Sequence, residues 1–362
     1  MEANLYEIAK YFQLEGEVKK ITPLGEGFIN DTYIIETEAD DSPNYLMQRK
    51  NKNIFTDVPA MMDNIERITS HLKKKISAQG GDVMREALTV IKTKEGALYY
   101  IDQEEEYWAV CLFIAGSVTY EAADTPELAY SGGKGIGKFQ RMTSDFTGKL
   151  SDILPGFHDI RFRFKQWDEV LAKDPVNRKK VLGKEIAWIE ERREEMLEFW
   201  KKVEAGVIPT RVTHNDTKIN NILFDDKGEV LCVIDLDTVL SSTALNDFGD
   251  AIRSYANTGS EDDKDLDKVT MDVKIFEAYT RGYLSEAKSF LTPVELDHLA
   301  FSAKYITYEQ VLRFLMDYID GDNYYKIKYA GHNLVRTHAQ YKLLQSIEKQ
   351  YDEMKIVVKS IL

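Results

Sequence analysis

The sequence predicts an α+β protein with two lobes, a small N-terminal lobe built on an antiparallel sheet and a larger, mainly helical C-terminal lobe. The chain has 362 residues, which is too long for one simple core, so two lobes are expected. Segments rich in β-branched and aromatic residues crowd the first part of the chain, whereas helical periodicity dominates the rest. We therefore predict an N-terminal lobe over residues 1–115 and a C-terminal lobe over residues 116–362.

The composition indicates an ordinary soluble enzyme rather than a nucleic-acid or membrane protein. The net charge of −14 argues against nucleic acid as a partner, because a basic face would be needed to displace counterions. Cys111 and Cys232 lie in apolar runs and are interpreted as core residues of a protein in a reducing compartment. The N-terminus lacks the pattern of an export signal, and no stretch is apolar enough to span a membrane. We therefore expect a cytoplasmic protein; its oligomeric state stays open.

The N-terminal lobe begins with a helical stripe at 4–13, followed by two strands that meet at Gly25-Glu26-Gly27. Glycines at these two positions would let backbone amides approach phosphates, although a plain hairpin turn fits the same pattern. A strand at 44–49 and a helix at about 57–76 follow. In kinases, a strand in this position offers a Lys to the phosphates, and a Glu of the following helix holds that Lys.

Two neighbouring residues, Arg49 and Lys50, are candidates for the phosphate-binding cation, and Glu66 is the candidate glutamate. Because Arg49 and Lys50 point to opposite faces of a strand, parity alone does not choose between them. An arginine would bind phosphate through its fork and pair with Glu66 in a bidentate manner. Segments 88–101 and 106–115 have strand patterns, with a turn signal at Glu95-Gly96. The second segment opens onto Gly116, where a hinge to the next lobe is expected.

The C-terminal lobe is predicted to be a set of helices. The glycine-rich segment 126–145 could be mistaken for a phosphate loop, but no strand precedes it, so we interpret it as a helix that permits close packing. Residues 184–204 have the pattern of a charged amphipathic helix. Several helices are expected over 271–360, with Pro293 at a start and Gly321 and Gly331 at breaks.

The stretch from Arg211 to Thr238, R-V-T-H-N-D-T-K-I-N-N-I-L-F-D-D-K-G-E-V-L-C-V-I-D-L-D-T, carries the chemistry. It has the pattern of a loop, a strand, a tight turn and a second strand that ends in acids. Asp216, Lys218 and Asn221 lie in the loop, and Asp235 follows Asn221 by fourteen residues. Phosphoryl transfer from ATP needs a carboxylate that orients the attacking hydroxyl and ligands that hold Mg²⁺ on the phosphates. The spacing therefore predicts a small-molecule kinase.

Each residue of the stretch has a predicted role. Asp216 is the orienting carboxylate, and Lys218 would neutralise charge on the transferred phosphoryl group. Asn221 and Asp235 offer oxygen atoms to Mg²⁺. His214 is interpreted as structural, since its ring can bind loop backbone and fix the geometry of Asp216.

The triplet Asp247-Phe248-Gly249 spells the metal-binding motif of protein kinases but lacks the hairpin that precedes Asp235. We therefore assign the metal to Asp235. Asp247 and Asp250 are interpreted as carboxylates at a helix start that support the catalytic loop from behind. Asp237 is either a second metal ligand or an acceptor that supports the first.

With these residues identified, the chain resembles the aminoglycoside phosphotransferase-like kinases, and within them the N-acetylhexosamine 1-kinases. The resemblance rests on segments in order over residues 20–340: L-G-E-G-F-I-N-D-T-Y, L-M-Q-R-K-N-K-N-I-F, T-H-N-D-T-K-I-N-N-I-L, V-I-D-L-D-T, D-F-G-D-A-I-R and K-Y-x-x-H-N-L-V-R-T. It implies a protein-kinase-like fold with two lobes. It also implies ATP- and Mg²⁺-dependent phosphorylation of the anomeric hydroxyl of N-acetylglucosamine or N-acetylgalactosamine.

The resemblance also assigns residues to the bound molecules. Arg49, with Glu66 and the Gly25 and Gly27 turn, would serve the nucleotide, while Asn30, Asp216, Arg313 and Tyr324 would contact the sugar. Phe28 stands where the family pattern would have His, so the hexosamine preference is left open. The alternative is a kinase of the same fold that acts on an aminoglycoside, choline or homoserine. A cationic acceptor of that kind should meet extra acids or an aromatic cage, and Asp317, Asp320 and Asp322 are the acids available.

Overall fold

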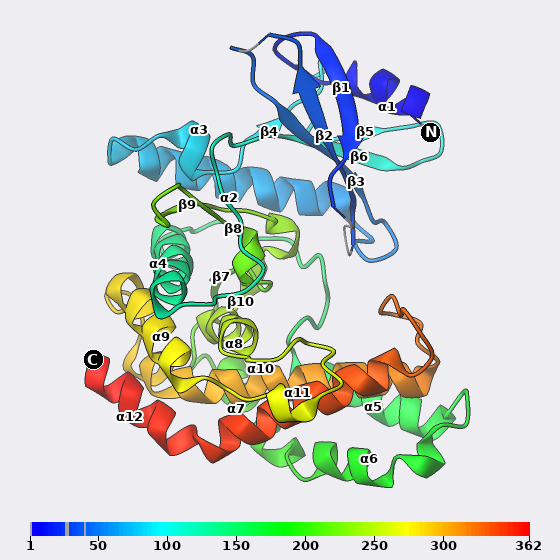
Figure 1. Cartoon of the computed structure of the whole chain (residues 1–362), viewed down its shortest axis with the longest axis vertical. Coiled ribbons are helices and arrows are strands. Elements are labelled where there is room, and N and C mark those ends of the chain that lie inside the picture. The colour runs from blue at the N-terminus through cyan, green and yellow to red at the C-terminus, as the bar shows by residue number, and fades with distance from the viewer. Residues whose placement is uncertain (1, 26–28, 40) are drawn as a thin grey trace. The chain divides into compact units, whose positions relative to one another are not determined.

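The computed structural model describes residues 2–25, 29–39 and 41–362, and it divides the chain into two compact units (Figure 1). The first unit comprises residues 1–119 together with 145–154 and 222–240. The second comprises residues 120–144, 155–221 and 241–362. The hairpin that ends near Asp235 therefore belongs to the same unit as the N-terminal sheet, although it lies more than a hundred residues further along the chain.

The first unit is built on a six-stranded antiparallel sheet in the order β1-β2-β3-β6-β4, with β5 paired to β6. The strands are β1 Val18–Pro23, β2 Asp31–Thr37, β3 Tyr45–Lys50, β4 Val90–Ile91, β5 Tyr100–Ile101 and β6 Tyr107–Leu112. The predicted β segment at 88–101 forms two short strands, and Gly96, at φ +88°, lies in the turn between them where the sequence has its turn signal. Alternate residues of β3 point to opposite faces, so Tyr45 and Met47 enter one core while Lys50 faces the other side.

Helices cover this sheet. The first is α1, Glu2–Ala9, whose Ile8 joins Phe12, Ile35 and Met47 in one buried cluster. The second, α2, Val58–Ala78, begins at Asp57, whose carboxylate accepts the Ala60 N–H at 3.0 Å as an N-cap. A short helix, α3, Val83–Glu86, follows it.

The hairpin of β8, Ile222–Phe224, and β9, Val230–Val233, completes the first unit. Its turn is held by the Asp225 carboxylate, which accepts the N–H groups of Lys227 and Glu229, and Gly228 supplies the positive φ of +78°. Cys232 is buried in this hairpin, while burial raises the pKa of the Cys111 thiol on β6 to about 11. The interpretation as a core residue is confirmed for Cys232, whereas Cys111 is only partly buried.

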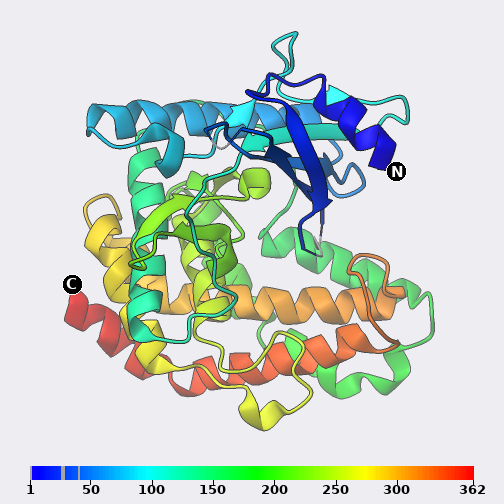
Figure 2. The same ribbon diagram turned by 45° about the horizontal axis from the view of Figure 1, so that its top comes forward.

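The second unit is mainly helical. Its elements are α4 Pro126–Thr143, α5 Ile160–Lys173, α6 Gly183–Glu190, α7 Arg193–Glu204, β7 Arg211–Thr213, α8 Ala244–Tyr255, α9 Val273–Ala287, α10 Pro293–Asp320, α11 His332–Lys349 and α12 Tyr351–Ile361. The strand β10, Leu240–Ser242, crosses from the first unit to the second. Figure 2 shows α10 and α11 running side by side below α8. The predicted α+β class, with an antiparallel sheet and then helices, is confirmed.

The glycine-rich segment forms α4, as predicted, and packs closely on α9. A side chain at Gly133 would lie 2.2 Å from the Tyr279 carbonyl oxygen, and one at Gly282 would lie 1.9 Å from that of Tyr130. The glycines therefore bring the two helix backbones together and do not form a phosphate loop.

Two other helix predictions have different outcomes. The start of α10 at Pro293 is confirmed, with a capping box between Thr292 and Glu295. Gly321 ends α10 and Gly331 precedes α11, as expected. The predicted single helix over 184–204 is instead two helices, α6 and α7, which break at Glu191 and Arg192; the Arg192 guanidinium there pairs with Glu348 at 2.8 Å.

Candidate active site

The catalytic loop of the second unit follows β7 and ends in a 3-10 helix, Ile219–Asn221. His214 is fully buried, and its Nδ1 accepts the N–H of Asp216 at 3.2 Å. Asn215, the residue between them, has a left-handed backbone at φ +66°, a conformation that non-glycine residues adopt mainly where the surroundings impose it. The ring of His214 therefore fixes the Asp216 backbone, as the sequence predicted.

Helix α8 supports the loop from behind. The Asp247 carboxylate accepts the N–H of His214 at 3.0 Å, that of Asn215 at 2.7 Å and the Gln140 side chain at 2.8 Å. Asp250 accepts the Thr217 N–H at 2.8 Å and pairs with Arg253 at 2.9 Å. The supporting role predicted for Asp247 and Asp250 is confirmed, and both carboxylates are occupied by it.

The structure brings Asp216, Lys218 and Asn221 together at the front of the loop. Lys218 Nζ lies 3.2 Å from Asp216 Oδ1, and Asn221 Nδ2 donates to Asp216 Oδ2 at 3.1 Å. The charge of Asp216 raises the pKa of Lys218, so this side chain is a cation at neutral pH. Asp216 retains 29% side-chain exposure, which leaves it accessible to a substrate.

In the first unit, Asp235 follows β9 and has a left-handed backbone at φ +57°. Two residues later, Asp237 is buried. Both of its oxygens lie 2.8 Å from Lys50 Nζ, and Asn30 donates to Oδ2 at 2.7 Å. Asp237 is therefore an acceptor for both Lys50 and Asn30.

Arg49 and Glu66 do not form the pair that the sequence suggested. Arg49 pairs with Asp31, the residue directly opposite on β2, whereas Glu66 pairs with Lys92 at 3.2 Å. Lys50 is the buried cation of β3, is 3% exposed, and lies on the face opposite Met47. The sequence missed the Lys50–Asp237 pair; the apolar parity of Tyr45 and Met47 was the signal that could have indicated it.

The remaining predicted residues of this lobe are only partly described. Gly25 has a positive φ of +67° and open space around the position of a side chain. Gly27 and Phe28 lie outside the described residues. Asn30 is 8% exposed, and its oxygen accepts the Asn51 N–H at 3.1 Å, so both ends of its side chain hold protein groups.

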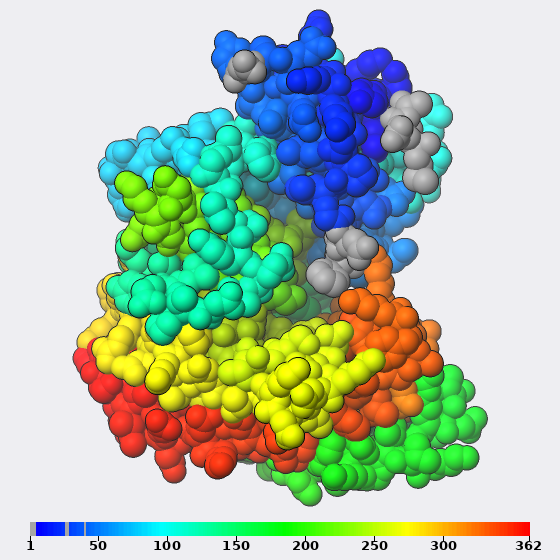
Figure 3. Space-filling model, in the orientation of Figure 1, coloured from blue at the N-terminus to red at the C-terminus, as the bar shows by residue number. Residues whose placement is uncertain are grey.

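Arg313, on α10, lies among three aromatic rings. Its guanidinium is 5.4 Å from the ring centre of Phe157, 5.7 Å from that of Tyr324 and 5.5 Å from that of Tyr325. It donates to Gln310 at 3.4 Å. The structure therefore brings Arg313 and Tyr324 together. The loop that carries Tyr324 lies at the surface, where Figure 3 shows this part of the chain in orange.

The carboxylates near Arg313 already have donors from the protein. Glu309 contacts His158 and Arg163, which outweigh its burial and lower its pKa to about 2. Asp322 accepts from Arg178 at 2.6 Å and from Asn333 at 2.9 Å. Asp317 accepts three backbone N–H groups and the Asn333 side chain. The sequence missed these roles, because the partners of Glu309 lie about 150 residues away and the donors to Asp317 are mainly backbone amides.

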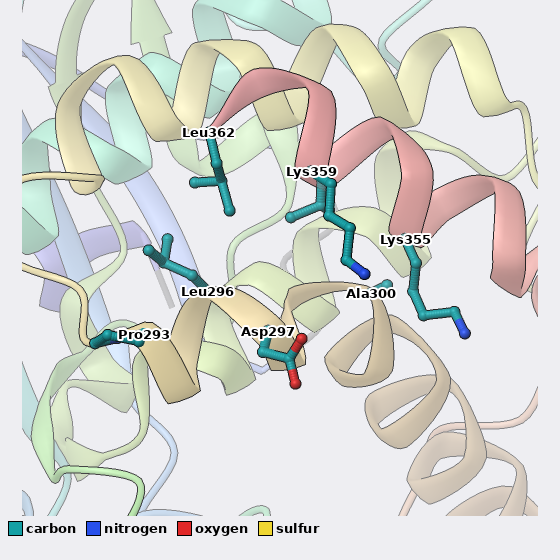
Figure 4. Close-up of a pocket in the computed structure, with 8 residues that line it drawn as sticks. Pro293, Leu296, Asp297, Ala300, Lys355, Lys359 and Leu362 are labelled. Carbon is teal, nitrogen blue, oxygen red and sulfur yellow. The ribbon is translucent and has the colours of Figure 1, made fainter.

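A cavity of about 210 Å³ lies elsewhere in the second unit, between α10 and α12 (Figure 4). Its lining combines apolar residues with Asp297, Lys355 and Lys359. None of the predicted catalytic residues lines it. Among the residues that the structure describes, no cluster of three or more His, Cys, Asp or Glu side chains could hold a metal, and no helix is long and apolar enough to cross a membrane.

Comparisons with known proteins identify a family and a fold. A family model described as the phosphotransferase enzyme family matches residues 20–286. The chain is similar in structure to an aminoglycoside phosphotransferase from Alicyclobacillus acidocaldarius, with a TM-score of 0.62, 13% identity and 96% of each chain covered.

Two further solved structures have the same fold. A spectinomycin phosphotransferase in complex with ADP and spectinomycin has a TM-score of 0.62 and 13% identity, with 98% of this chain and 99% of that chain covered. A microcompartment-associated aminopropanol kinase has a TM-score of 0.63 and 14% identity, with 98% of each chain covered. The fold is therefore kinase-like, as predicted.

Proposed function

Because the chain belongs to the phosphotransferase enzyme family, we propose that it transfers the γ-phosphoryl group of ATP to the anomeric hydroxyl of an N-acetylhexosamine. Membership of the family supports the class of reaction, a kinase with a hydroxyl acceptor. The segments that resemble N-acetylhexosamine 1-kinases support the choice of an N-acetylhexosamine as that acceptor. The chemistry around Asp216 and Arg313 supports both.

Asp216 would accept the proton of the attacking hydroxyl and place its oxygen in line with the γ-phosphorus. The Asn221 side chain donates its N–H to Asp216, which fixes the carboxylate and turns the amide oxygen away from it. Lys218, held as a cation beside Asp216, would balance the charge on the transferred group. As the bond to the leaving phosphate breaks, the proton of the hydroxyl passes to Asp216.

The donors for the metal fit a hard divalent cation. Asn221 has an amide oxygen and Asp235 a carboxylate, and oxygen ligands of this kind suit Mg²⁺. Bound there, Mg²⁺ would neutralise charge on the phosphates. Asp237 would hold Asp235 in place through its own contacts with Lys50 and Asn30. Lys50 is buried and paired with Asp237, whereas the Arg49 side chain is 41% exposed, so Arg49 remains our proposed cation of β3 for the nucleotide.

The surroundings of Arg313 carry the choice of acceptor. Three aromatic rings form a cage, but the cage holds the guanidinium of the protein itself. Glu309, Asp317 and Asp322 are engaged with protein donors, so they do not balance a charged ligand. A choline or aminoglycoside cation would be repelled by Arg313, whereas the hydroxyl and carbonyl oxygens of an N-acetylated sugar would accept its N–H groups. We therefore favour a neutral sugar, bound by Arg313 with Tyr324 against the ring.

An acceptor panel tests this proposal. We expect release of ADP with N-acetylglucosamine or N-acetylgalactosamine, and background rates with choline, homoserine and an aminoglycoside. Turnover of a cationic acceptor in preference to every hexosamine would refute the choice. The variant Asp216→Asn should lower kcat by about 10²–10⁴ and keep ATP binding, because it removes the acceptor for the hydroxyl proton. Asp226→Asn, in the exposed turn between β8 and β9, is the matched control.

A further inference from the structure

One face of α10 carries three buried polar residues at intervals of four, namely Glu309, Arg313 and Asp317. Residues spaced by four lie one above another on a helix. We propose that Glu309 and Asp317 are positioning residues. Glu309 fixes the catalytic loop relative to Arg313. Asp317 fixes the segment after α10 that carries Tyr324, which we call the acceptor-binding loop, relative to the same arginine. The identity of the acceptor rests on the proposed function, whereas the two positioning contacts do not.

The Glu309 end of this face reaches the catalytic loop through His158. Glu309 Oε2 lies 2.6 Å from His158 Nδ1, and Oε1 accepts Arg163 Nε at 3.1 Å. On its other side, His158 Nε2 lies 3.4 Å from the carbonyl oxygen of Asn215, the residue before Asp216. Glu309 is 1% exposed, so its charge is confined to these contacts.

His158 is itself held firmly in this position. Its backbone has a φ of +58°, and its carbonyl oxygen accepts the Tyr305 hydroxyl at 2.8 Å. Its ring packs on Phe157 at 4.3 Å, and Phe157 in turn contacts the guanidinium of Arg313. A continuous set of contacts therefore joins Arg313, through Phe157 and His158, to the loop of Asp216.

The Asp317 end holds the loop that follows α10. Gly321, at φ +104°, and Asp322, at φ +62°, reverse the chain at the end of the helix. Asp317 Oδ1 then accepts the N–H groups of Asn323 at 2.9 Å and Tyr324 at 2.8 Å. Its Oδ2 accepts the Tyr325 N–H at 3.0 Å and the Asn333 side chain at 2.8 Å. A single buried carboxylate thus receives three successive amides of the segment that places Tyr324 and Tyr325 beside Arg313.

Replacing each carboxylate by its isosteric amide should cause a different kinetic defect at each end of this helix face. An amide has one acceptor oxygen, so Asp317→Asn turns an NH₂ group toward N–H donors of the acceptor-binding loop. Glu309→Gln likewise turns an NH₂ group toward His158 or Arg163. The catalytic loop, which His158 contacts, is then held less firmly. Loss of order where the sugar binds weakens acceptor binding, whereas loss of order around Asp216 slows the transfer step.

Steady-state kinetics of both variants with N-acetylglucosamine and ATP test this division. For Glu309→Gln we expect kcat to fall by about 10–10² while the acceptor KM changes little, since a displaced reacting group slows chemistry. For Asp317→Asn we expect the acceptor KM to rise by about tenfold or more and the ATP KM to stay the same. Asp297→Asn, exposed near the start of the same helix, is the control. Equal losses of kcat in both variants with unchanged KM values would overturn the proposal.

Hydrogen exchange gives a readout that needs no acceptor. In Asp317→Asn the amides of residues 323–325 should exchange faster, while those of 213–217 keep their protection. In Glu309→Gln the amides of 213–217 should exchange faster, while those of residues 323–325 keep their protection. If both segments exchange as in the wild type, the positioning roles are wrong whatever the acceptor. If the exchange pattern appears but no hexosamine is phosphorylated, the proposed acceptor is wrong and the positioning roles stand.

Discussion

Replacing Asp247 with Asn should expose how strongly the catalytic loop depends on one buried carboxylate. Its Oδ1 accepts the Asn215 N–H at 2.7 Å, and its Oδ2 accepts the His214 N–H at 3.0 Å and Gln140 Nε2 at 2.8 Å. In either orientation the new NH₂ group faces at least one of these donors. Gln140 cannot turn its amide without cost, because its oxygen accepts the Tyr283 hydroxyl.

The magnitude follows from these contacts. A buried donor left without an acceptor costs about 1–3 kcal/mol, and two of the three contacts are lost in one orientation. Burial also raises the pKa of Asp247, so removal of the charge recovers part of that cost. We therefore expect the free energy of unfolding to fall by about 1–3 kcal/mol. Displacement of the loop should also lower kcat by about 10–10².

Urea unfolding at neutral pH, together with steady-state kinetics, measures both effects. Asp159→Asn is the matched control, because Asp159 caps α5 with one oxygen that accepts the N–H groups of Arg161 and Phe162. Asn caps a helix as well as Asp does, so this variant should change stability by only a few tenths of a kcal/mol. The reasoning is refuted if the two variants unfold at the same urea concentration and turn over at the same rate.

Three further predictions concern packing and charge. Gly282→Ala should destabilise the protein by about 1–3 kcal/mol through overpacking of α4 against α9, while Gly183→Ala, which has open space, should not; thermal unfolding compares them. The lowered pKa of Glu309 gives stability that is present above about pH 4.5 and is lost as pH falls toward about 2, so the stability difference between wild type and Glu309→Gln should shrink over that range. Lys50→Met should cost about 3–5 kcal/mol because it leaves Asp237 buried without its cation, and Lys50→Met combined with Asp237→Leu should cost less than the sum of the single changes.

The sequence predicted the parts of the site that lie close together in the chain. The loop from His214 to Asn221 and the hairpin before Asp235 carry their own turn and strand patterns, so their geometry could be inferred directly. The support from Asp247 could also be predicted, because a helix start with an acid is recognisable.

Contacts between distant residues could not be predicted in the same way. The Lys50–Asp237 pair joins residues 187 positions apart, and strand parity around Arg49 allowed two answers. The cross-strand neighbour Asp31, which takes Arg49 away from Glu66, depends on the register of β2 and β3. Asp317 was missed for a different reason, because its amide donors are only six to eight residues away but backbone donors leave no trace in the residue types. Buried pairing of this kind follows from the fold and not from local sequence.

The most direct test of the central claim is phosphorus NMR of the product formed from ATP, Mg²⁺ and N-acetylglucosamine by the purified protein. Phosphorylation at the anomeric hydroxyl predicts a product signal that is split by coupling to the anomeric proton. A product phosphorylated at the C6 hydroxyl, or no product with any hexosamine, would contradict the proposed function.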